Sequence, residues 1–333
     1  MLRPMVKAVS VRRRALARGV RQRAPRLVAL GDLLLDVVVV PEGPIERGSD
    51  VPGSVTFRRG GSAANTAAAF ARAGGVALLI TVLGHDAWTK RLVASLRADG
   101  VRVHAIRRRG PGGRLAAVID ERGERSFVTQ RGVADDLHAS DVVAARLRDV
   151  AVLHVPAYSL LAEPIGTAAL FAARQAHDAG ALVSSDLSSV GRLRSFGIRA
   201  SRARMGEVAP DVLFAGRAEA AAILGQPGRR AWPRLLELAP LVVVKDGAAG
   251  CRVLWRDPDS PSVLQLEVAA TRIPKVDATG AGDAFAAGFL FSLLQSGGQA
   301  VLGHAPGLRR AALAGHRSAA DALRRGRAEI RLG

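Results

Sequence analysis

The sequence predicts an α/β protein: a doubly wound, mainly parallel sheet flanked by helices, with a small β-sheet lid. From residue 150 onward, apolar runs of strand length alternate with helical patterns, which is the rhythm of parallel strands joined by crossover helices. These runs are apolar almost throughout, as expected for strands that are buried on both faces. Shorter β-prone pieces between residues 33 and 131 fall outside this alternation. We expect these pieces to form the lid.

The first predicted strand covers residues 26–30 and ends at Gly31 and Asp32. Residues 33–40 continue as an apolar run that is interrupted by Asp36. A carboxylate inside such a run is costly unless it is exposed or serves a purpose. Asp36 is therefore a candidate functional residue.

The diglycine Gly60-Gly61 opens a helix made almost wholly of small residues, and a second glycine pair closes it at residues 74–75. Such a helix packs closely against a sheet, and its first turn offers free N–H groups. Close packing alone explains the alanines. Asn65, near the start of this helix, is harder to explain by packing and is a second candidate.

The lid is expected to combine residues 33–58 with three short strands at 101–107, 114–120 and 125–130. The last two strands are joined by a hairpin signal at residues 121–124. A strand at 76–83 and a helix at 87–98 precede them and belong to the main α/β body.

The alternating part has four predicted strands, at 150–155, 181–185, 212–214 and 241–245. Its predicted helices cover 162–179, 192–206, 217–224 and 232–238. Parallel sheets of this kind bind ligands at the carboxyl ends of their strands. Asp32, Asp186, Asp246 and Gly247 lie just after predicted strands, so we expect them at that edge.

The stretch 276–285 carries the sharpest functional signal. Gly280 and Gly282 flank Ala281, and an apolar helical pattern starts directly after them. Free N–H groups and the positive end of the helix dipole make such a helix start an anion site. Asp283 falls in the first turn, where a carboxylate either caps the helix or takes a proton from a substrate hydroxyl during phosphoryl transfer. This stretch by itself leaves both interpretations open.

Composition narrows the class of protein. Of the 333 residues, 49% are hydrophobic and 23% are charged, as in globular domains. The one cysteine, Cys251, excludes an internal disulfide and favours a reducing, cytoplasmic location. No apolar run approaches the ~20 residues that cross a bilayer, so we expect no membrane partner.

The net charge of +19 suggests a nucleic-acid partner, but nine of the basic residues and no acidic ones lie within residues 1–26. The chain has one tyrosine and three tryptophans for stacking on bases, so we expect no specific nucleic acid. We interpret residues 1–25 as a basic, disordered arm or as sequence upstream of the true start. A transit peptide stays open because acidic residues are absent, although serine is scarce.

The two glycine motifs together resemble those of the ribokinase-like (PfkB) carbohydrate kinase family. The run Gly60-Gly61-Ser62-Ala63-Ala64-Asn65 is similar to the N-terminal signature of the family, and Asp277-Ala278-Thr279-Gly280-Ala281-Gly282-Asp283-Ala284-Phe285 is similar to its C-terminal signature. The order of the motifs and the strand–helix rhythm between them fit as well. The resemblance implies a ribokinase-like kinase domain over residues 26–333, with lid segments at about 33–58 and 101–131.

The resemblance implies an ATP-dependent phosphotransferase acting on a hydroxymethyl group of a sugar or sugar-like substrate. It implies Asp283 as the general base, and an anion hole formed by the backbone of Gly280, Ala281 and Gly282. It implies that the sugar is bound by Asp36, Asp32, Gly60, Gly61 and Asn65. It implies that the nucleotide is bound by Lys245, Gly247 and Gly250. The resemblance implies Mg²⁺ beside Glu219. It implies a potassium ion beside Asp277, as in many members of the family. It also implies a homodimer that forms through the lid.

Two positions depart from the family pattern. The family usually has an asparagine three residues before the glutamate near magnesium, and this chain has Gly216 there, which weakens the metal role of Glu219. Ser62 stands where ribokinases proper tend to have lysine, which argues against ribose as the substrate.

Two alternatives remain open beside the sugar kinase. One is a nucleoside kinase acting on adenosine-like substrates, because the same scaffold serves them. The other is a non-catalytic α/β protein that binds phosphate or nucleic acid at its anion site. The sequence has no Gly-x-x-x-x-Gly-Lys-Ser/Thr loop and no His-Arg-Asp loop, so other phosphoryl-transfer scaffolds are not favoured.

Overall fold

The structure is a computed structural model that describes residues 24–120, 125–257, 260–271, 273 and 278–330. Nearly all of the predicted basic arm and Asp277 lie outside the described residues.

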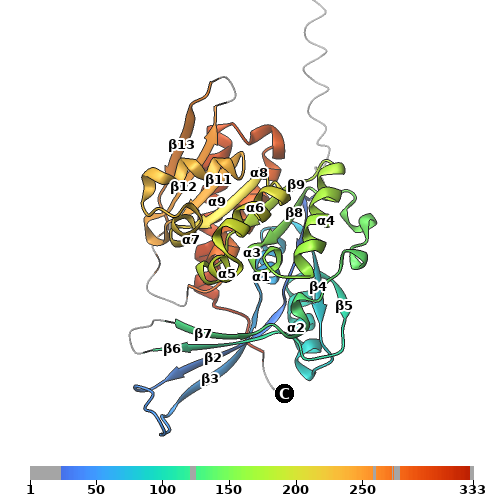
Figure 1. Cartoon of the computed structure of the whole chain (residues 1–333), viewed down its shortest axis with the longest axis vertical. Coiled ribbons are helices and arrows are strands. Elements are labelled where there is room, and N and C mark those ends of the chain that lie inside the picture. The colour runs from blue at the N-terminus through green and yellow to red at the C-terminus, as the bar shows by residue number, and fades with distance from the viewer. Residues whose placement is uncertain (1–23, 121–124, 258–259, 272, 274–277, 331–333) are drawn as a thin grey trace, which may run out of the picture.

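Two separate sheets organise the described part of the chain (Figure 1). The strands of the large sheet are β1 Arg26–Leu30, β4 Val76–Leu83, β5 Arg102–Arg107, β8 Val152–Pro156, β9 Leu182–Asp186, β10 Val212–Gly216, β11 Leu241–Lys245, β12 Cys251–Arg256 and β13 Val263–Val268. They lie in the order β13-β12-β11-β10-β9-β8-β1-β4-β5. All neighbouring pairs from β11 to β5 are parallel, and β12 and β13 add to the edge in antiparallel fashion. The predicted doubly wound, mainly parallel sheet is thereby confirmed.

Strand β1 is the point where the winding reverses, because β4 and β8 pair with it on opposite sides. Ligand sites in open α/β sheets form at such a reversal, beyond the carboxyl ends of the strands. Asp32 follows β1 at this point and is buried, with 1% of its surface exposed.

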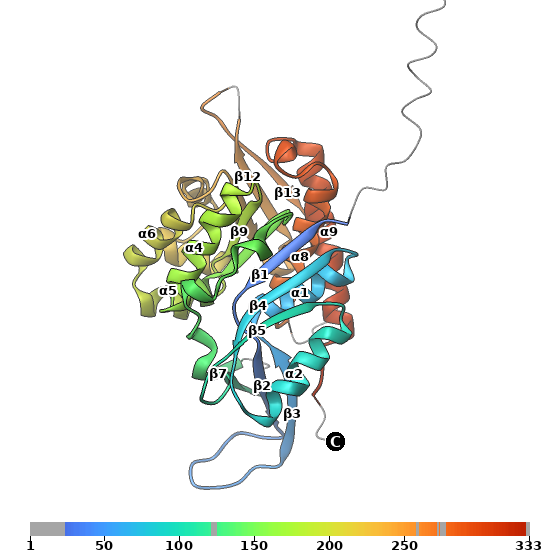
Figure 2. The same cartoon turned by 90° about the vertical axis from the view of Figure 1, so that its right-hand side faces the viewer.

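Helices cover both faces of the large sheet. They are α1 Ser62–Arg72, α2 Ala87–Ala98, α3 Ala157–Leu160, α4 Ile165–Asp178, α5 Val190–Phe196, α6 Ile198–Val208, α7 Arg217–Leu224, α8 Ala281–Gln295 and α9 Ala305–Arg325. Figure 2 shows α4, α5 and α6 on one face of the sheet and α1, α8 and α9 on the other. Each face carries its own cluster of buried apolar side chains.

Helix α8 is anchored by aromatic side chains that its sequence pattern predicted. The ring of Phe214, on β10, contacts Phe285 and Phe289 edge to face, with centroid distances of 6.4 and 5.5 Å. On the other side, a Cβ at Gly315 of α9 would lie 2.9 Å from the Phe285 ring, so only glycine allows this approach. The buried rings fix the start of α8 relative to the ends of the strands.

The small sheet consists of β2 Leu34–Pro41, β3 Gly53–Gly60, β6 Arg114–Ile119 and β7 Arg125–Gln130, in the order β3-β2-β6-β7. It lies beyond one end of the large sheet in Figure 1. The prediction that residues 101–107 belong to the lid is wrong. They form β5, which pairs with β4 in parallel from Leu78↔Arg102 to Leu83↔Arg107. Helix α2 makes the crossover between these two strands, so they form one β-α-β unit of the large sheet.

Two predicted helices differ in the structure. The segment 192–206 is not one helix but α5 and α6, separated by Gly197, which has a positive φ of 93°. The segment 232–238 belongs to a 3₁₀ helix, Arg229–Glu237, that contains Pro233. Proline has no N–H group to continue an α-helical ladder.

Within the described residues, no helix combines the length and the apolar character that crossing a bilayer requires.

Candidate active site

A cleft of about 770 Å³ lies between the two sheets. Its walls include side chains of β2, β6 and β7 from the small sheet and the last residues of β9, β10 and β11 from the large one. It is lined by most of the residues that the sequence singled out: Asp32, Asp36, Gly61, Asn65, Asp186, Glu219, Lys245, Gly247, Gly280, Gly282 and Asp283. The cleft thus lies at the carboxyl edge of the large sheet, where the sequence predicted the ligand-binding residues.

Some predicted site residues do not line this cleft. They are Gly60, Gly250, Ala281 and Asp246. Asp246 pairs instead with Arg229, with Nη2 and Oδ2 2.7 Å apart. A Cβ at Gly250 would overlap the carbonyl oxygen of Val268, so this glycine is required by the packing of β12 against β13.

Helix α8 presents Asp283 to the cleft from its first turn. Gly280 is the N-cap and has φ 82°, a left-handed conformation that glycine adopts without strain. Both oxygens of the Asp283 side chain accept hydrogen bonds from α1. The carboxylate is therefore bonded to a second helix as well as lying in the first turn of its own.

The two glycine motifs meet at this carboxylate. Ser62 Oγ donates to Asp283 Oδ1 over 2.7 Å, and Asn65 Nδ2 donates to Oδ2 over 2.9 Å. The pKa of Asp283 is raised from its ordinary 3.8 to about 7, mainly because the carboxyl group is buried. The hydrogen bonds from Ser62 and Asn65 and the nearby Lys245 act against this rise, whereas Asp186 adds to it. A carboxyl group with a pKa near 7 is suited to accept a proton at neutral pH.

The predicted anion hole consists of backbone N–H groups at the start of α8. The N–H of Ala281 donates to the carbonyl of Ala278 over 3.2 Å. One of the N–H groups of the anion hole predicted at residues 280–283 is thus engaged within the turn, and the anion hole itself stays a prediction.

The ammonium group of Lys245 lies beneath this helix start. A Cβ at Gly282 would stand 3.1 Å from Lys245 Nζ, so the side chain approaches the backbone closely. Lys245 forms an ion pair with Asp186, at the end of β9. Burial lowers the pKa of Lys245, but Asp186, Glu219 and Asp283 outweigh it and the pKa is raised. Lys245 is therefore a cation among three carboxylates.

Glu219 lies in the first turn of α7, and burial and the nearby Asp186 raise the pKa of its carboxyl group. Its side chain folds back over Gly216, where any Cβ would overlap the carboxylate. The glycine that stands in place of the expected asparagine therefore leaves room for this rotamer of Glu219. The sequence could not give this contact, because it depends on the local turn from β10 into α7.

Asp186 and Glu219 together suit a magnesium ion that arrives with phosphates. Mg²⁺ is usually held by one or two carboxylates, by substrate phosphates and by waters. The described residues contain no cluster of three or more His, Cys, Asp or Glu that would hold a metal alone. One ammonium among three carboxylates leaves an excess of negative charge that a divalent cation would relieve. The donor set thus fits Mg²⁺ bound together with a nucleotide.

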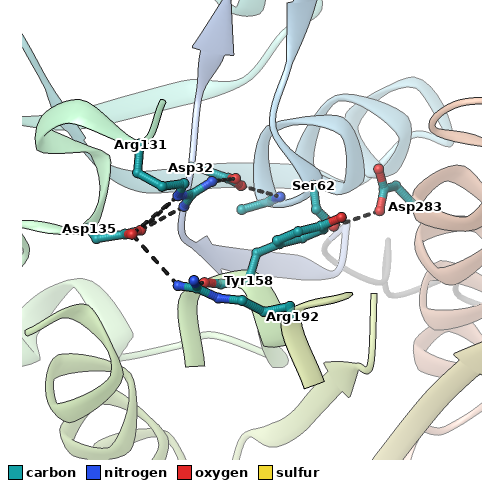
Figure 3. Close-up of polar contacts among 8 residues, drawn as sticks. Asp32, Ser62, Arg131, Asp135, Tyr158, Arg192 and Asp283 are labelled. Carbon is teal, nitrogen blue, oxygen red and sulfur yellow. Dashed lines mark hydrogen bonds and ion pairs between the residues drawn. The ribbon is translucent and has the colours of Figure 1, made fainter. Parts of the chain in front are cut away.

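The other end of the cleft holds a charged network that the sequence did not reveal (Figure 3). Arg131 Nη1 donates to Asp32 Oδ2 over 2.8 Å, and its Nη2 donates to Asp135 over 2.7 Å. Arg192 lies 3.7 Å from Asp135 and donates to the backbone carbonyl of Tyr158. Both carboxylates raise the pKa of Arg131, against the effect of burial. Arg192 follows β9 at the edge where ligand-binding residues gather, which is the signal that could have indicated it.

The diglycine turn fits closely against two aspartates. Gly61 has φ 102°, and a Cβ there would overlap the backbone carbonyl of Asp32. A Cβ at Gly60 would overlap the carboxylate of Asp36, which is 5% exposed. Asp36 also forms an ion pair with Arg327. Gly60 thus gives room to the carboxylate of Asp36, and Gly61 gives room to the backbone of Asp32.

Comparison with known proteins agrees with this geometry. The model described as "pfkB family carbohydrate kinase" matches residues 24–329. "Probable fructokinase-6, chloroplastic" from Arabidopsis thaliana is 28% identical over 293 residues, 83% of this chain and 72% of that protein. The solved structure of adenosine kinase from Sinorhizobium meliloti has a TM-score of 0.77 and 25% identity, over 90% of this chain and 94% of that one. That of a probable sugar kinase from Rhizobium etli CFN 42 has a TM-score of 0.78 and 24% identity, over 91% and 94%.

Proposed function

Because this chain belongs to the pfkB family of carbohydrate kinases, we propose that it transfers the γ-phosphoryl group of ATP to a hydroxymethyl group of a sugar. The observation that carries the proposal is the placement of Asp283. This carboxylate has a pKa of about 7, opens into the cleft and shares it with Asn65 and Asp36. We assign the activity to a kinase domain of residues 26–333, with residues 1–25 as an arm outside it.

Asp283 acts as the general base. Each of its oxygens accepts one hydrogen bond, from Ser62 or Asn65, and keeps a further lone pair for the proton of the attacking hydroxyl. These two bonds fix the carboxylate, so the hydroxyl that it deprotonates is held in line with the phosphorus.

The start of α8 stabilises charge on the transferred phosphoryl group. The N–H groups of Gly282 and Asp283 provide two donors, and the helix dipole adds to their effect. The Lys245 ammonium, beside Gly282, contributes a full positive charge at the same place. Lys245 and Gly247 line the part of the cleft that takes the nucleotide phosphates.

Asp186 and Glu219 would hold Mg²⁺ with the nucleotide. When bound, the ion neutralises phosphate charge and orients the donor. We also propose a potassium site beside Asp277, and this part of the proposal is supported by the family resemblance alone.

The acceptor occupies the end of the cleft at the small sheet. Asp32, Asp36 and Asn65 offer oxygens and an amide to its hydroxyl groups. The fructokinase relatives favour a sugar such as fructose. The likeness to an adenosine kinase keeps an adenosine-like nucleoside as the second candidate. A non-catalytic binding protein is no longer supported, since the family consists of kinases.

The small sheet also serves as a lid that mediates a homodimer. Its apolar side chains Val55, Phe127 and Val128 are 57%, 52% and 74% exposed. Such residues on one sheet suit contact with a second copy. The enzyme works in the cytoplasm, where its buried thiol, Cys251, with a pKa raised to about 12 by burial, stays inert.

A panel assay tests the function. ADP release is measured with ATP, Mg²⁺ and, in turn, D-fructose, D-ribose, other hexoses and adenosine. We expect turnover with a sugar, and fastest turnover with adenosine would favour the second candidate. If no acceptor in the panel causes ADP release, the proposed function is refuted.

A further inference from the structure

Residues 326–330, which we call the tail segment, leave the end of α9 and join the small sheet. The N–H of Arg59 donates to Ala328 O over 2.9 Å, and the N–H of Ile330 donates to Phe57 O over 2.7 Å. Arg58 and Glu329 form an antiparallel bridge between the same two stretches. The tail segment therefore lines the free edge of β3 as an additional short strand.

The tail segment is held in place by burial as well as by backbone bonds. Ile330 is 5% exposed and belongs to the apolar cluster that also contains the core residues of α8 and α9. At the other end, Gly326 terminates α9 with φ 68° and turns the chain toward β3. The segment thus has a defined path from the helix pair to the small sheet.

From this segment Arg327 reaches the cleft wall. Its Nη1 donates to Asp36 Oδ2, and the two side chains are only 10% and 8% exposed. The other carboxylate oxygen, Oδ1, is packed against Gly60. The carboxylate of Asp36 is therefore confined between a guanidinium group and a glycine.

We propose that Arg327 is a positioning residue for the sugar acceptor: it holds the Asp36 carboxylate oriented toward the cleft. The inference rests on the proposed function, in which Asp36 accepts hydrogen bonds from the substrate. A buried carboxylate that loses an ion-pair partner is held less firmly in one orientation. It then loses part of the fixed acceptor geometry that a sugar hydroxyl needs. Arg327 does not line the cleft, so it acts through Asp36 rather than on the substrate.

Steady-state kinetics of Arg327→Gln test the inference. The acceptor is the panel compound that the wild type phosphorylates fastest, with ATP as the donor. We expect the KM for the acceptor to rise by about tenfold to hundredfold, as for truncation of one partner of a buried charge pair. The kcat and the KM for ATP should stay within about threefold of wild type, because neither Asp283 nor the nucleotide end is touched. Arg327→Lys, which keeps a charge, should recover part of the affinity.

Arg325→Gln is the matched control, since Arg325 lies exposed in the last turn of α9 and should leave all constants unchanged. Thermal melting of each variant separates a loss of fold from a loss of positioning. A fall in kcat that parallels a fall in Tm, with the acceptor KM unchanged, would overturn the inference.

Asp36→Asn separates this inference from the proposed function. If Asp36→Asn raises the acceptor KM but Arg327→Gln does not, the positioning role is wrong and the substrate role of Asp36 stands. If neither variant changes the acceptor KM, the substrate role assigned to Asp36 is wrong, and the inference is wrong with it. The double variant Asp36→Asn, Arg327→Gln completes the test. If its acceptor KM equals that of Asp36→Asn alone, Arg327 acts through that carboxylate.

Discussion

Ser62 and Asp283 are 221 positions apart in the chain, yet the hydroxyl of one donates to the carboxylate of the other over 2.7 Å. The contact joins the first turns of α1 and α8, each of which begins directly after a glycine. The two glycine motifs therefore form one site. Burial raises the pKa of Asp283, and this contact lowers it, so the serine helps to set the pH at which the base works.

Replacing Ser62 by alanine should move the pH profile. Loss of a hydrogen bond to the charged form raises the pKa of Asp283, by about one unit for a bond worth about 1.5 kcal/mol. The acidic limb of log(kcat/KM) should therefore shift to higher pH by about that amount. Ser296→Ala, at the far end of α8, is the control. An unshifted acidic limb would mean that another group governs it.

Replacing Asp283 by asparagine should stabilise the fold at alkaline pH. The folded-state pKa of about 7 exceeds the ordinary 3.8, so the folded protein binds more protons than the unfolded chain between these values. Stability from this group is therefore lost as pH rises through that window, by at most about 4 kcal/mol. We expect Asp283→Asn to melt above wild type at pH 8 and close to it at pH 4. A variant that melts below wild type at pH 8 would contradict the raised pKa.

Replacing Lys245 by methionine should slow phosphoryl transfer. The change removes the ammonium beside Gly282 and leaves Asp186 without its ion pair. We expect kcat to fall by about a hundredfold, as for loss of one transition-state donor. Lys90→Met, at an exposed position of α2, is the control. A wild-type kcat in Lys245→Met would remove the lysine from the mechanism.

Replacing Glu219 by glutamine should weaken the response to magnesium. Glutamine keeps the size of the side chain but not the charge that Mg²⁺ prefers. We expect the Mg²⁺ concentration for half-maximal rate to rise by about tenfold, while Glu207→Gln on the exposed face of α6 changes nothing. Equal magnesium curves for the wild type and Glu219→Gln would show that this glutamate does not hold the metal.

The sequence predicted those parts of the site that depend on local patterns. The start of α8 could be located because Gly280 and Gly282 stand next to an apolar helical pattern. The ends of β9 and β11 could be located from short strand patterns, and this placed Asp186 and Gly247 at the sheet edge. In each case the signal lies within about ten residues.

The remaining parts depend on contacts between distant segments. Residues 102–107 look like any short strand, and only pairing with β4 assigns them to the large sheet. Arg131 finds Asp32 across 99 positions, and Arg327 finds Asp36 across 291. The chain has many arginines, and nothing in the local sequence around one of them identifies the carboxylate that it pairs with. The ion-pair network at the acceptor end therefore had to come from the structure.

The most direct test of the account is kcat of Asp283→Asn with the best sugar acceptor, measured beside binding of the same sugar. If Asp283 is the base, kcat should fall by at least about a hundredfold, while the dissociation constant for the sugar stays within about threefold. Wild-type turnover in this variant would contradict the account at its centre.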